Sequence, residues 1–202
     1  NEEKTILSVI NEVEDFKDFK KEILVIDDGS SDNTKNLLKD LNKEHIKVFY
    51  HDRNYGKGKA IQTGIRESTG DIIIIQDADL EYSPTDYPTL IKPFKESDAD
   101  VVYGSRFLGG AGYVRLHYYL HFIANKILTH FCNIFTNLNL TDMECCYKVF
   151  KSEVIKSVKL EENRFGFEPE VTAKISKKDV RIYEVGVTYF GRKYSEGKKI
   201  TW

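Results

Sequence analysis

The chain has 202 residues, of which 41% are hydrophobic and 31% are charged, a composition typical of a globular protein. This length predicts a single domain with a sizeable core. A net charge of −2, from 30 basic and 32 acidic residues, leaves no electrostatic case for a nucleic-acid partner. The three cysteines lack zinc-ligand spacing, so free thiols in a reducing compartment are expected. No stretch approaches the roughly 20 apolar residues of a membrane span.

The first half of the chain alternates between strand patterns and helix patterns. This alternation predicts an α/β fold, with a mostly parallel sheet flanked by helices. Ligands of such sheets bind beyond the carboxyl ends of the strands. The predicted strands are 22–27, 46–50, 72–76 and 100–103, and the predicted helices are 32–41, 58–67 and 87–95.

The first predicted strand ends in two adjacent carboxylates, Asp27 and Asp28. Gly29 and the serines after it are ordinary features of a turn between a strand and a helix. Adjacent carboxylates at a strand end are harder to explain in this way, because their charges repel. They could accept hydrogen bonds from ribose hydroxyls or from a base N–H. A GxGxxG motif is absent from this turn, so a hydride-transfer enzyme is not expected.

Residues 54–59, Asn-Tyr-Gly-Lys-Gly-Lys, lie between the second strand and the next helix. Gly56, Lys57 and Lys59 suit an anionic group at a helix N-terminus, through exposed N–H groups and through positive charge. The segment is not a Walker A loop, because it lacks the length and the Lys-Ser/Thr ending. A flexible basic turn explains the same residues about equally well.

The most informative stretch is a run of four isoleucines followed by Gln76, Asp77, Ala78 and Asp79. The run predicts a strand buried on both faces. If the strand continues, its two-residue period puts Asp77 and Asp79 on the same side. Asp is a common turn residue. However, two carboxylates at the end of a buried strand suit a divalent ion that bridges to a phosphorylated ligand.

The second half opens with an aromatic-rich helical pattern at 115–138. Core packing is the preferred interpretation of its aromatic residues, and a membrane surface is the alternative. Arg106 follows the fourth strand, so it should also lie at the ligand edge. The remaining predicted elements are an extended segment at 143–150, helices at 152–158 and 169–176, a strand at 180–189 and a basic tail at 191–202.

Several of these segments occur together in the order of one known family. VIDDGSSDNT, NYGKGKAIQTG, GDIIIIQDADLEY, VVYGSRF, TDMECCYKVF and FEPEVTAKI resemble the family 2 glycosyltransferases of the GT-A fold, especially the polyprenyl- and dolichyl-phosphate hexosyltransferases. The resemblance implies one Rossmann-like GT-A catalytic domain over residues 1–202. The family opens with a strand ahead of the residues that match Asn1 and Glu2. The resemblance therefore implies that the first strand is missing and that the domain is truncated at both ends.

The resemblance also implies a reaction and a set of partners. Such enzymes move a hexose, with inversion, from a UDP- or GDP-linked sugar to a polyprenyl phosphate, using Mg²⁺ or Mn²⁺. It places the aromatic helix at the cytoplasmic face of a membrane, and homo-oligomerisation stays open. The implied binding residues are Glu2, Asp27 and Asp28 for the nucleoside, Asp77 and Asp79 for the metal with Gln76 and Ala78 beside them, and Arg106, Arg192 and Lys198 for phosphate.

The acceptor decides whether a general base is needed. A phosphate monoester is largely ionised at neutral pH, so it attacks without a strong base. A hydroxyl acceptor on a glycan or protein would need a carboxylate base, for which Asp142 and Glu144 are candidates. A nucleotide-sugar binder without turnover is a further alternative. The expected catalytic residues are Asp77, Asp79, Arg106, Asp142 and Arg192.

Overall fold

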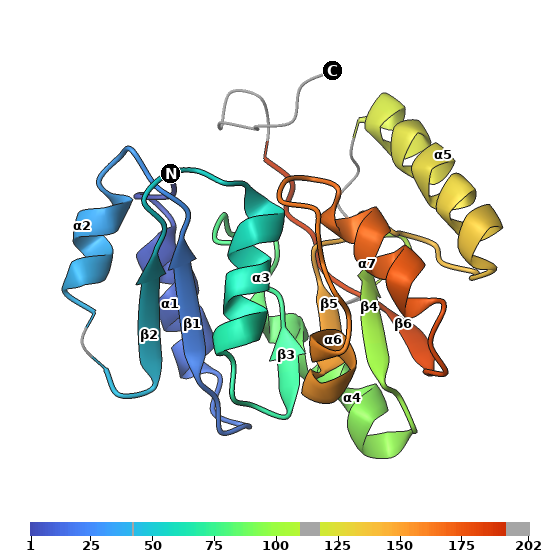
Figure 1. The fold of residues 1–202 in the computed structure, drawn as a ribbon, viewed down its shortest axis with the longest axis horizontal. Helices are drawn as coiled ribbons and strands as arrows, with labels where there is room; N and C mark the ends of the chain where they lie inside the picture. The colour runs from blue at the N-terminus through green and yellow to red at the C-terminus, as the bar shows by residue number, and fades with distance from the viewer. Residues whose placement is uncertain (42, 110–117, 193–202) are drawn as a thin grey trace.

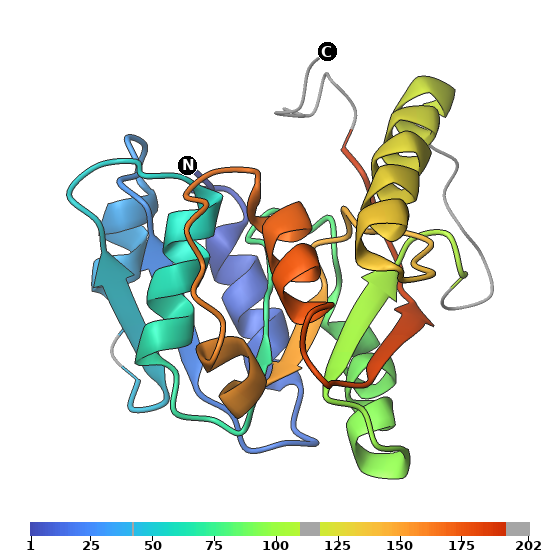
Figure 2. The same ribbon diagram turned by 45° about the vertical axis from the view of Figure 1, so that its right-hand side comes forward.

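Strands form a central layer with helices on both faces (Figures 1 and 2). The computed structural model describes residues 1–41, 43–109 and 118–192. The strands are β1 (Ile23–Asp27), β2 (Ile46–Tyr50), β3 (Ile72–Ile74), β4 (Val101–Ser105), β5 (Lys148–Lys151) and β6 (Ile182–Gly186). The helical elements are α1 (Ile6–Asp15), α2 (Thr34–Lys39), α3 (Lys57–Glu67), the 3₁₀ turn η1 (Pro84–Asp86), α4 (Tyr87–Glu96), α5 (Tyr119–Thr136), α6 (Ser152–Lys156) and α7 (Phe167–Ile175).

The strands form two sheets, a parallel pair β1–β2 and a four-stranded sheet in the order β3–β5–β4–β6. The predicted α/β class is confirmed, but the larger sheet is mixed. β4 and β6 are parallel, whereas β5 runs antiparallel to both of its neighbours. β5 is antiparallel because the chain returns from α5 at the carboxyl edge of β4, where the Ser105 and Thr141 hydroxyls lie 2.6 Å apart. Most of the other predicted elements are found with small shifts at their ends, but the extended segment predicted at 143–150 forms a strand only from Lys148.

β3 is shorter and more open than the isoleucine run predicts. It spans Ile72–Ile74, all three of which are half-buried, and it pairs with β5 along one edge. The prediction of a strand over 72–76 that is buried on both faces is therefore wrong. Within the described residues, β1 and β3 each pair along one edge, and they are neighbouring strands in Figure 1. The missing first strand stays a prediction.

Two hydrophobic clusters match the two sheets. The larger cluster surrounds β4 and β5, where Val101, Val102, Val149 and Phe150 are fully buried. The smaller cluster joins Ile6 and Ile10 of α1 to Leu38 of α2 and Ile46 of β2. Burial of these side chains fixes the strand layer, so the carboxyl ends of β1, β3 and β4 are held on a rigid base.

α5 turns a polar side toward the rest of the molecule. Its buried residues are Asn125 and Thr129. The Asn125 amide donates to Asp142, and the Thr129 hydroxyl accepts from the Met143 N–H. Core packing of the aromatic residues is therefore wrong, because polar side chains occupy the inner side of this helix. The side chains that face outward include Tyr119, Leu120, Ile127, Leu128, Phe131, Ile134 and Phe135.

α5 lies along the edge of the molecule in Figure 2. Residues 115–117 of the predicted helix lie outside the described residues. Within the part of the chain that the structure describes, no helix has both the length and the hydropathy of a membrane span.

Asp100 joins three strands at the edge opposite the ligand edge. Its carboxylate accepts from the Arg181 backbone N–H at 2.9 Å, from the Arg181 Nε at 3.1 Å and from the Lys151 Nζ at 2.7 Å. These residues stand at or beside the ends of β4, β5 and β6 that lie away from the candidate site. Hydrogen bonds from Arg181 and Lys151 hold the pKa of Asp100 well below its usual value.

We expect Asp100→Asn to lower the free energy of unfolding by about 1.5–3 kcal/mol, because it weakens charge-assisted hydrogen bonds. The folded-state pKa is depressed, so this stabilisation is present at neutral pH and is lost as the pH falls. In urea unfolding, the difference in unfolding free energy between wild type and variant should therefore be constant near neutral pH and should narrow as the pH falls below about 4. Asp98→Asn removes an exposed partner of the same arginine and should have little effect. A difference in unfolding free energy between wild type and variant that stays constant down to acidic pH would contradict this account.

Candidate functional site

The acidic motif lies beyond the carboxyl end of β3, but not on a continued strand. β3 ends at Ile74, and Ala78 and Asp79 form a turn. The prediction that a strand period aligns Asp77 with Asp79 is therefore wrong. Leu80 has a φ of 61°, an uncommon backbone conformation for a residue other than glycine. The turn at Ala78 and Asp79 directs the carboxylates of Asp77 and Asp79 to different cationic side chains.

Asp77 pairs with Lys57. The Lys57 Nζ lies 3.1 Å from Asp77 Oδ2 and 3.0 Å from Glu168 Oε1. Lys57 stands at the start of α3, and Glu168 stands in the first turn of α7. Burial opposes the charge on Asp77, but Lys57 outweighs burial and lowers the pKa of Asp77. Lys57 thus joins α3, α7 and the acidic turn.

Asp79 pairs with Arg192, near the end of the described chain. The Arg192 Nη2 lies 3.1 Å from Asp79 Oδ2, and its Nε lies 3.2 Å from Glu81 Oε1. Its Nη1 lies 3.7 Å from Glu2 Oε2. Burial and the negative charges of Asp77 and Glu81 raise the pKa of Asp79 to about 6. The predicted residues Glu2, Asp79 and Arg192 therefore meet at one place. Lys198 lies outside the described residues.

The chemistry of this acidic pair fits a hard divalent cation. Mg²⁺ is commonly held by one or two carboxylates, with phosphate and water oxygens in the remaining positions. Asp77 and Asp79 offer two such carboxylates. Within the described ranges, no group of three or more histidine, cysteine, aspartate or glutamate side chains is arranged for a metal ion. A cation here would therefore depend on oxygens from a ligand or from water.

The two carboxylates at the end of β1 have different environments. Asp27 is only 4% exposed, and its buried Oδ2 has no hydrogen-bond partner among the described residues. Asp28 accepts from the N–H groups of Tyr55 and Gly56 and contacts the His51 ring. Asp28 therefore holds the 54–59 loop in place, whereas Asp27 keeps an unused acceptor.

The 54–59 loop does not offer its N–H groups to an anion. The Gly58 N–H donates to the Arg164 carbonyl at 3.2 Å, and the Lys59 N–H donates to the Asn163 carbonyl at 2.9 Å. Gly56, with a φ of 110°, and Gly58 are needed because a Cβ at either position would come within 2.4 Å of this facing backbone. The prediction of exposed N–H groups at this helix N-terminus is therefore wrong. Lys59 is half-buried, and its phosphate role stays a prediction.

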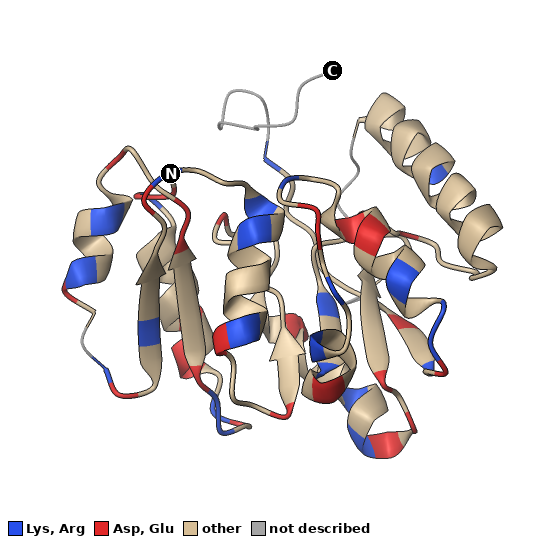
Figure 3. Cartoon of the chain, in the orientation of Figure 1, with Lys and Arg blue, Asp and Glu red and all other residues tan. Residues whose placement is uncertain are grey.

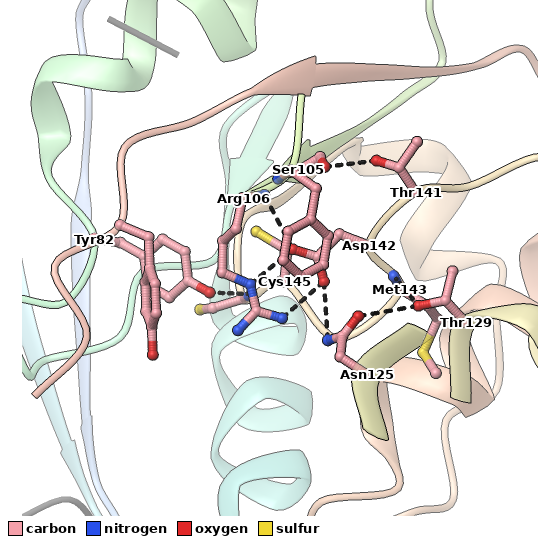
Figure 4. Close-up of polar contacts among 12 residues, drawn as sticks. Tyr82, Ser105, Arg106, Asn125, Thr129, Thr141, Asp142, Met143 and Cys145 are labelled. Carbon is pink, nitrogen blue, oxygen red and sulfur yellow. Dashed lines mark hydrogen bonds and ion pairs between the residues drawn. The ribbon is translucent and has the colours of Figure 1, made fainter. Parts of the chain in front are cut away.

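Arg106 and Asp142 form a buried ion pair beyond β4 (Figure 4). The Arg106 Nε and Nη2 donate to the two Asp142 oxygens, each at 2.7 Å. Asp142 also accepts from the Arg106 N–H and the Asn125 amide and is fully buried. Burial opposes its charge, but Arg106 outweighs burial and lowers the pKa of Asp142. Asp142 is thereby unsuited to act as a general base.

The pKa of Glu144 is shifted in the opposite direction to that of Asp142. It is half-buried. Burial and the nearby negative charge of Glu168 raise the pKa of Glu144. Of the two carboxylates proposed as bases for a hydroxyl acceptor, Glu144 therefore has the better-placed pKa.

Gln76 has a supporting role in the structure. Its Oε1 accepts from the Tyr87 hydroxyl at 3.0 Å and from the Tyr147 hydroxyl at 2.7 Å. Ala78 packs against the smaller hydrophobic cluster. Both residues therefore hold the backbone of the acidic turn, and their contact with a substrate stays a prediction.

Three further residues shape the site, and none of them is among the predicted site residues. Glu168 pairs with Lys57, Glu81 pairs with Arg192, and Lys148 is fully buried. The Lys148 Nζ donates to the carbonyls of Met143 and Cys145, which fixes the turn that carries Asp142 and Glu144. In the sequence, only the family-like FEPE segment pointed to Glu168 as a site residue.

Removing Arg106 should destabilise the protein, because it leaves a buried negative charge without its partner. Arg106→Met leaves the Asp142 carboxylate buried without its cation, and we expect a loss of about 3–5 kcal/mol in the free energy of unfolding. Adding Asp142→Asn removes that charge, so the double variant should be more stable than Arg106→Met alone. Urea unfolding of the three variants measures the coupling. Equal stability of the single and the double variant would contradict this reading of the pair.

Acidic residues at the end of β1 and basic residues at the start of α3 lie at one edge of the molecule (Figure 3). A family model, "Glycosyl transferase family 2", matches residues 1–159. The chain belongs to this family and is a glycosyltransferase with a GT-A fold.

Two curated proteins match most of this chain in sequence. A dodecaprenyl-phosphate galacturonate synthase of Rhizobium johnstonii is 28% identical over 180 residues, which cover 88% of this chain and 52% of that protein. An uncharacterized protein of Methanocaldococcus jannaschii is 29% identical over 94% of this chain and 85% of its own length. This chain therefore spans about half of the galacturonate synthase.

Solved structures agree in fold. The crystal structure of Mycobacterium tuberculosis glucosyl-3-phosphoglycerate synthase matches with a TM-score of 0.70. The match covers 97% of this chain and 71% of that chain, at 20% identity. A likeness at this identity establishes the arrangement of strands and helices.

Proposed function

We propose that this chain is a metal-dependent, inverting hexosyltransferase that moves a sugar from a UDP- or GDP-linked donor to a polyprenyl phosphate. The observation that carries the proposal is the pair Asp77 and Asp79 beyond β3, close to the acidic end of β1. The lipid phosphate acceptor is supported by the name of the galacturonate synthase relative. A phosphorylated acceptor also fits the mycobacterial synthase, whose structures include one with Mn²⁺, UDP-glucose and phosphoglyceric acid.

The donor nucleoside is bound at the end of β1. The unused Asp27 Oδ2 accepts a hydrogen bond from a base N–H, which ends its buried, unpaired state. Uracil and guanine both carry such a group, so this hydrogen bond fits both UDP-linked and GDP-linked donors. Glu2 lies near the same edge, where its N–H donates to the Thr34 hydroxyl. Asp28 acts indirectly, by holding the neighbouring loop.

Asp77 and Asp79 hold the divalent cation, Mg²⁺ or Mn²⁺. When bound, this cation neutralises negative charge on the departing nucleoside diphosphate. Arg106 and Arg192, with Lys198, supply further positive charge toward the donor and acceptor phosphates. The acceptor phosphate attacks the anomeric carbon from the face opposite the leaving group, so the configuration inverts.

The ionised acceptor phosphate needs no protein base, in keeping with an Asp142 that is fully engaged by Arg106 and Asn125. The second candidate function is transfer to a hydroxyl of a glycan or protein. It is favoured by the raised pKa of the half-buried Glu144. An acceptor panel separates the two functions, because only the first uses lipid phosphate.

Asp79→Asn should reduce transfer from labelled UDP- and GDP-sugars to polyprenyl phosphate by about 100-fold or more, because it removes a metal ligand. The product is measured as lipid-linked label, with and without Mg²⁺ or Mn²⁺. Asp98→Asn makes the same change at an exposed residue, whose partners are Arg181 and Tyr183, and should leave transfer unchanged. Undiminished transfer by Asp79→Asn, or transfer that does not depend on metal, would overturn the mechanism.

The outward face of α5 supports a membrane surface as a further partner. Phe135 is 85% exposed and Phe131 is 54% exposed. A lipid acceptor lies in a bilayer, and an apolar helix face can lie in the bilayer interface. This supports the proposal that the enzyme is a peripheral membrane protein; the cytoplasmic face is what the family resemblance implies.

Phe131→Ser with Phe135→Ser should weaken binding to phosphatidylcholine–phosphatidylglycerol vesicles by about tenfold or more, because less apolar surface enters the bilayer. Vesicle flotation measures the bound fraction. Phe165→Ser is the matched control, since Phe165 is 72% exposed and lies outside α5. Equal binding by the double variant, or an equal loss in the control, would contradict the role of α5.

A further inference from the structure

Arg192 makes more carboxylate contacts than a surface arginine normally does. Its guanidinium contacts Asp79 at 3.1 Å, Glu81 at 3.2 Å and Glu2 at 3.7 Å. Its side chain is only 20% exposed. These carboxylates come from the start of the chain and from the acidic turn after β3. One guanidinium therefore neutralises charge contributed by two distant segments.

Glu81 anchors the segment that carries Arg192. One Glu81 carboxylate oxygen accepts from the Arg192 N–H at 3.0 Å, and the other accepts from the Tyr189 hydroxyl at 2.8 Å. The Glu81 carbonyl accepts from the Phe190 N–H at 2.8 Å. Because these bonds do not involve Asp79, the segment stays attached if Arg192 releases that carboxylate.

The contact between Arg192 and Asp79 conflicts with a cation at the same carboxylate. Two positive charges a few ångströms apart repel strongly in a partly buried site. Asp79 Oδ1 already accepts the Glu81 N–H at 3.1 Å, and Oδ2 faces Arg192. A divalent ion that binds Oδ2 therefore competes with the guanidinium for this oxygen.

We propose that Arg192 is an internal counter-ion that competes with the divalent cation for Asp79, and that Glu81 is the positioning residue that holds Arg192 beside the site after the exchange. The inference rests on the proposed function and adds an order of events to it. Cation binding releases the guanidinium from Asp79, and the released guanidinium is then available to the donor diphosphate. The same side chain thus stabilises the acidic turn before donor binding and binds the donor afterwards.

The test measures cation binding without turnover. Mn²⁺ alone is titrated into the protein, and free Mn²⁺ is followed by electron paramagnetic resonance. Arg192→Met should bind Mn²⁺ about tenfold more tightly than wild type, because a competing positive charge is gone. With saturating Mn²⁺, the same variant should bind UDP or GDP more weakly. A purely structural role would not give these opposite effects.

Arg66→Met is the matched control, because Arg66 is exposed on α3 and pairs with the neighbouring Glu67. It should leave Mn²⁺ affinity unchanged. Arg192→Gln is the second variant, and thermal unfolding checks that both variants are folded. If wild type binds Mn²⁺ and neither Arg192 variant binds it more tightly, the competition is refuted while the proposed function stands. If wild type and Arg192→Met both bind no Mn²⁺, either alone or in the presence of UDP or GDP, the metal-dependent function itself fails.

Discussion

The neutralisation of carboxylates at the carboxyl edge of the sheets is the interaction on which the rest of the site depends. Strand ends bring Asp27, Asp77 and Asp79 into a partly buried region, where unpaired charges are costly. Lys57 and Arg192 compensate the acidic turn, and Arg106 compensates Asp142 farther along the same edge. Each cation comes from a different part of the fold. The site is therefore a balance of charges that is fixed by tertiary structure.

This balance explains why several of the predicted site residues have a supporting role. Asp28, Gln76 and Asp142 make their hydrogen bonds inside the protein and hold loops against the strand layer. The buried Oδ2 of Asp27, by contrast, has no hydrogen-bond partner among the described residues. An enzyme that acts on charged nucleotides gains from this rigidity, because preorganised groups need little rearrangement when the substrate binds.

Local sequence patterns predicted the strands, most helices and the edge at which Asp77, Asp79 and Arg106 lie. These features depend on apolar periodicity and on turn residues, which act over short distances. The partners of the acidic residues could not be predicted in this way. Asp79 and Arg192 are 113 positions apart, and only the fold brings them together. The helix predicted from the 115–138 pattern is found as α5, but the core-packing interpretation failed, because aromatic content does not reveal that Asn125 and Thr129 face inward.

The wide separation of these partners has a consequence for folding. Loop closure over more than a hundred residues is entropically unfavourable, so such contacts form late, once nearby elements have already assembled. During synthesis the acidic turn leaves the ribosome long before Arg192 is made. The nascent domain therefore passes through a stage in which the Asp79 carboxylate lacks that intramolecular partner.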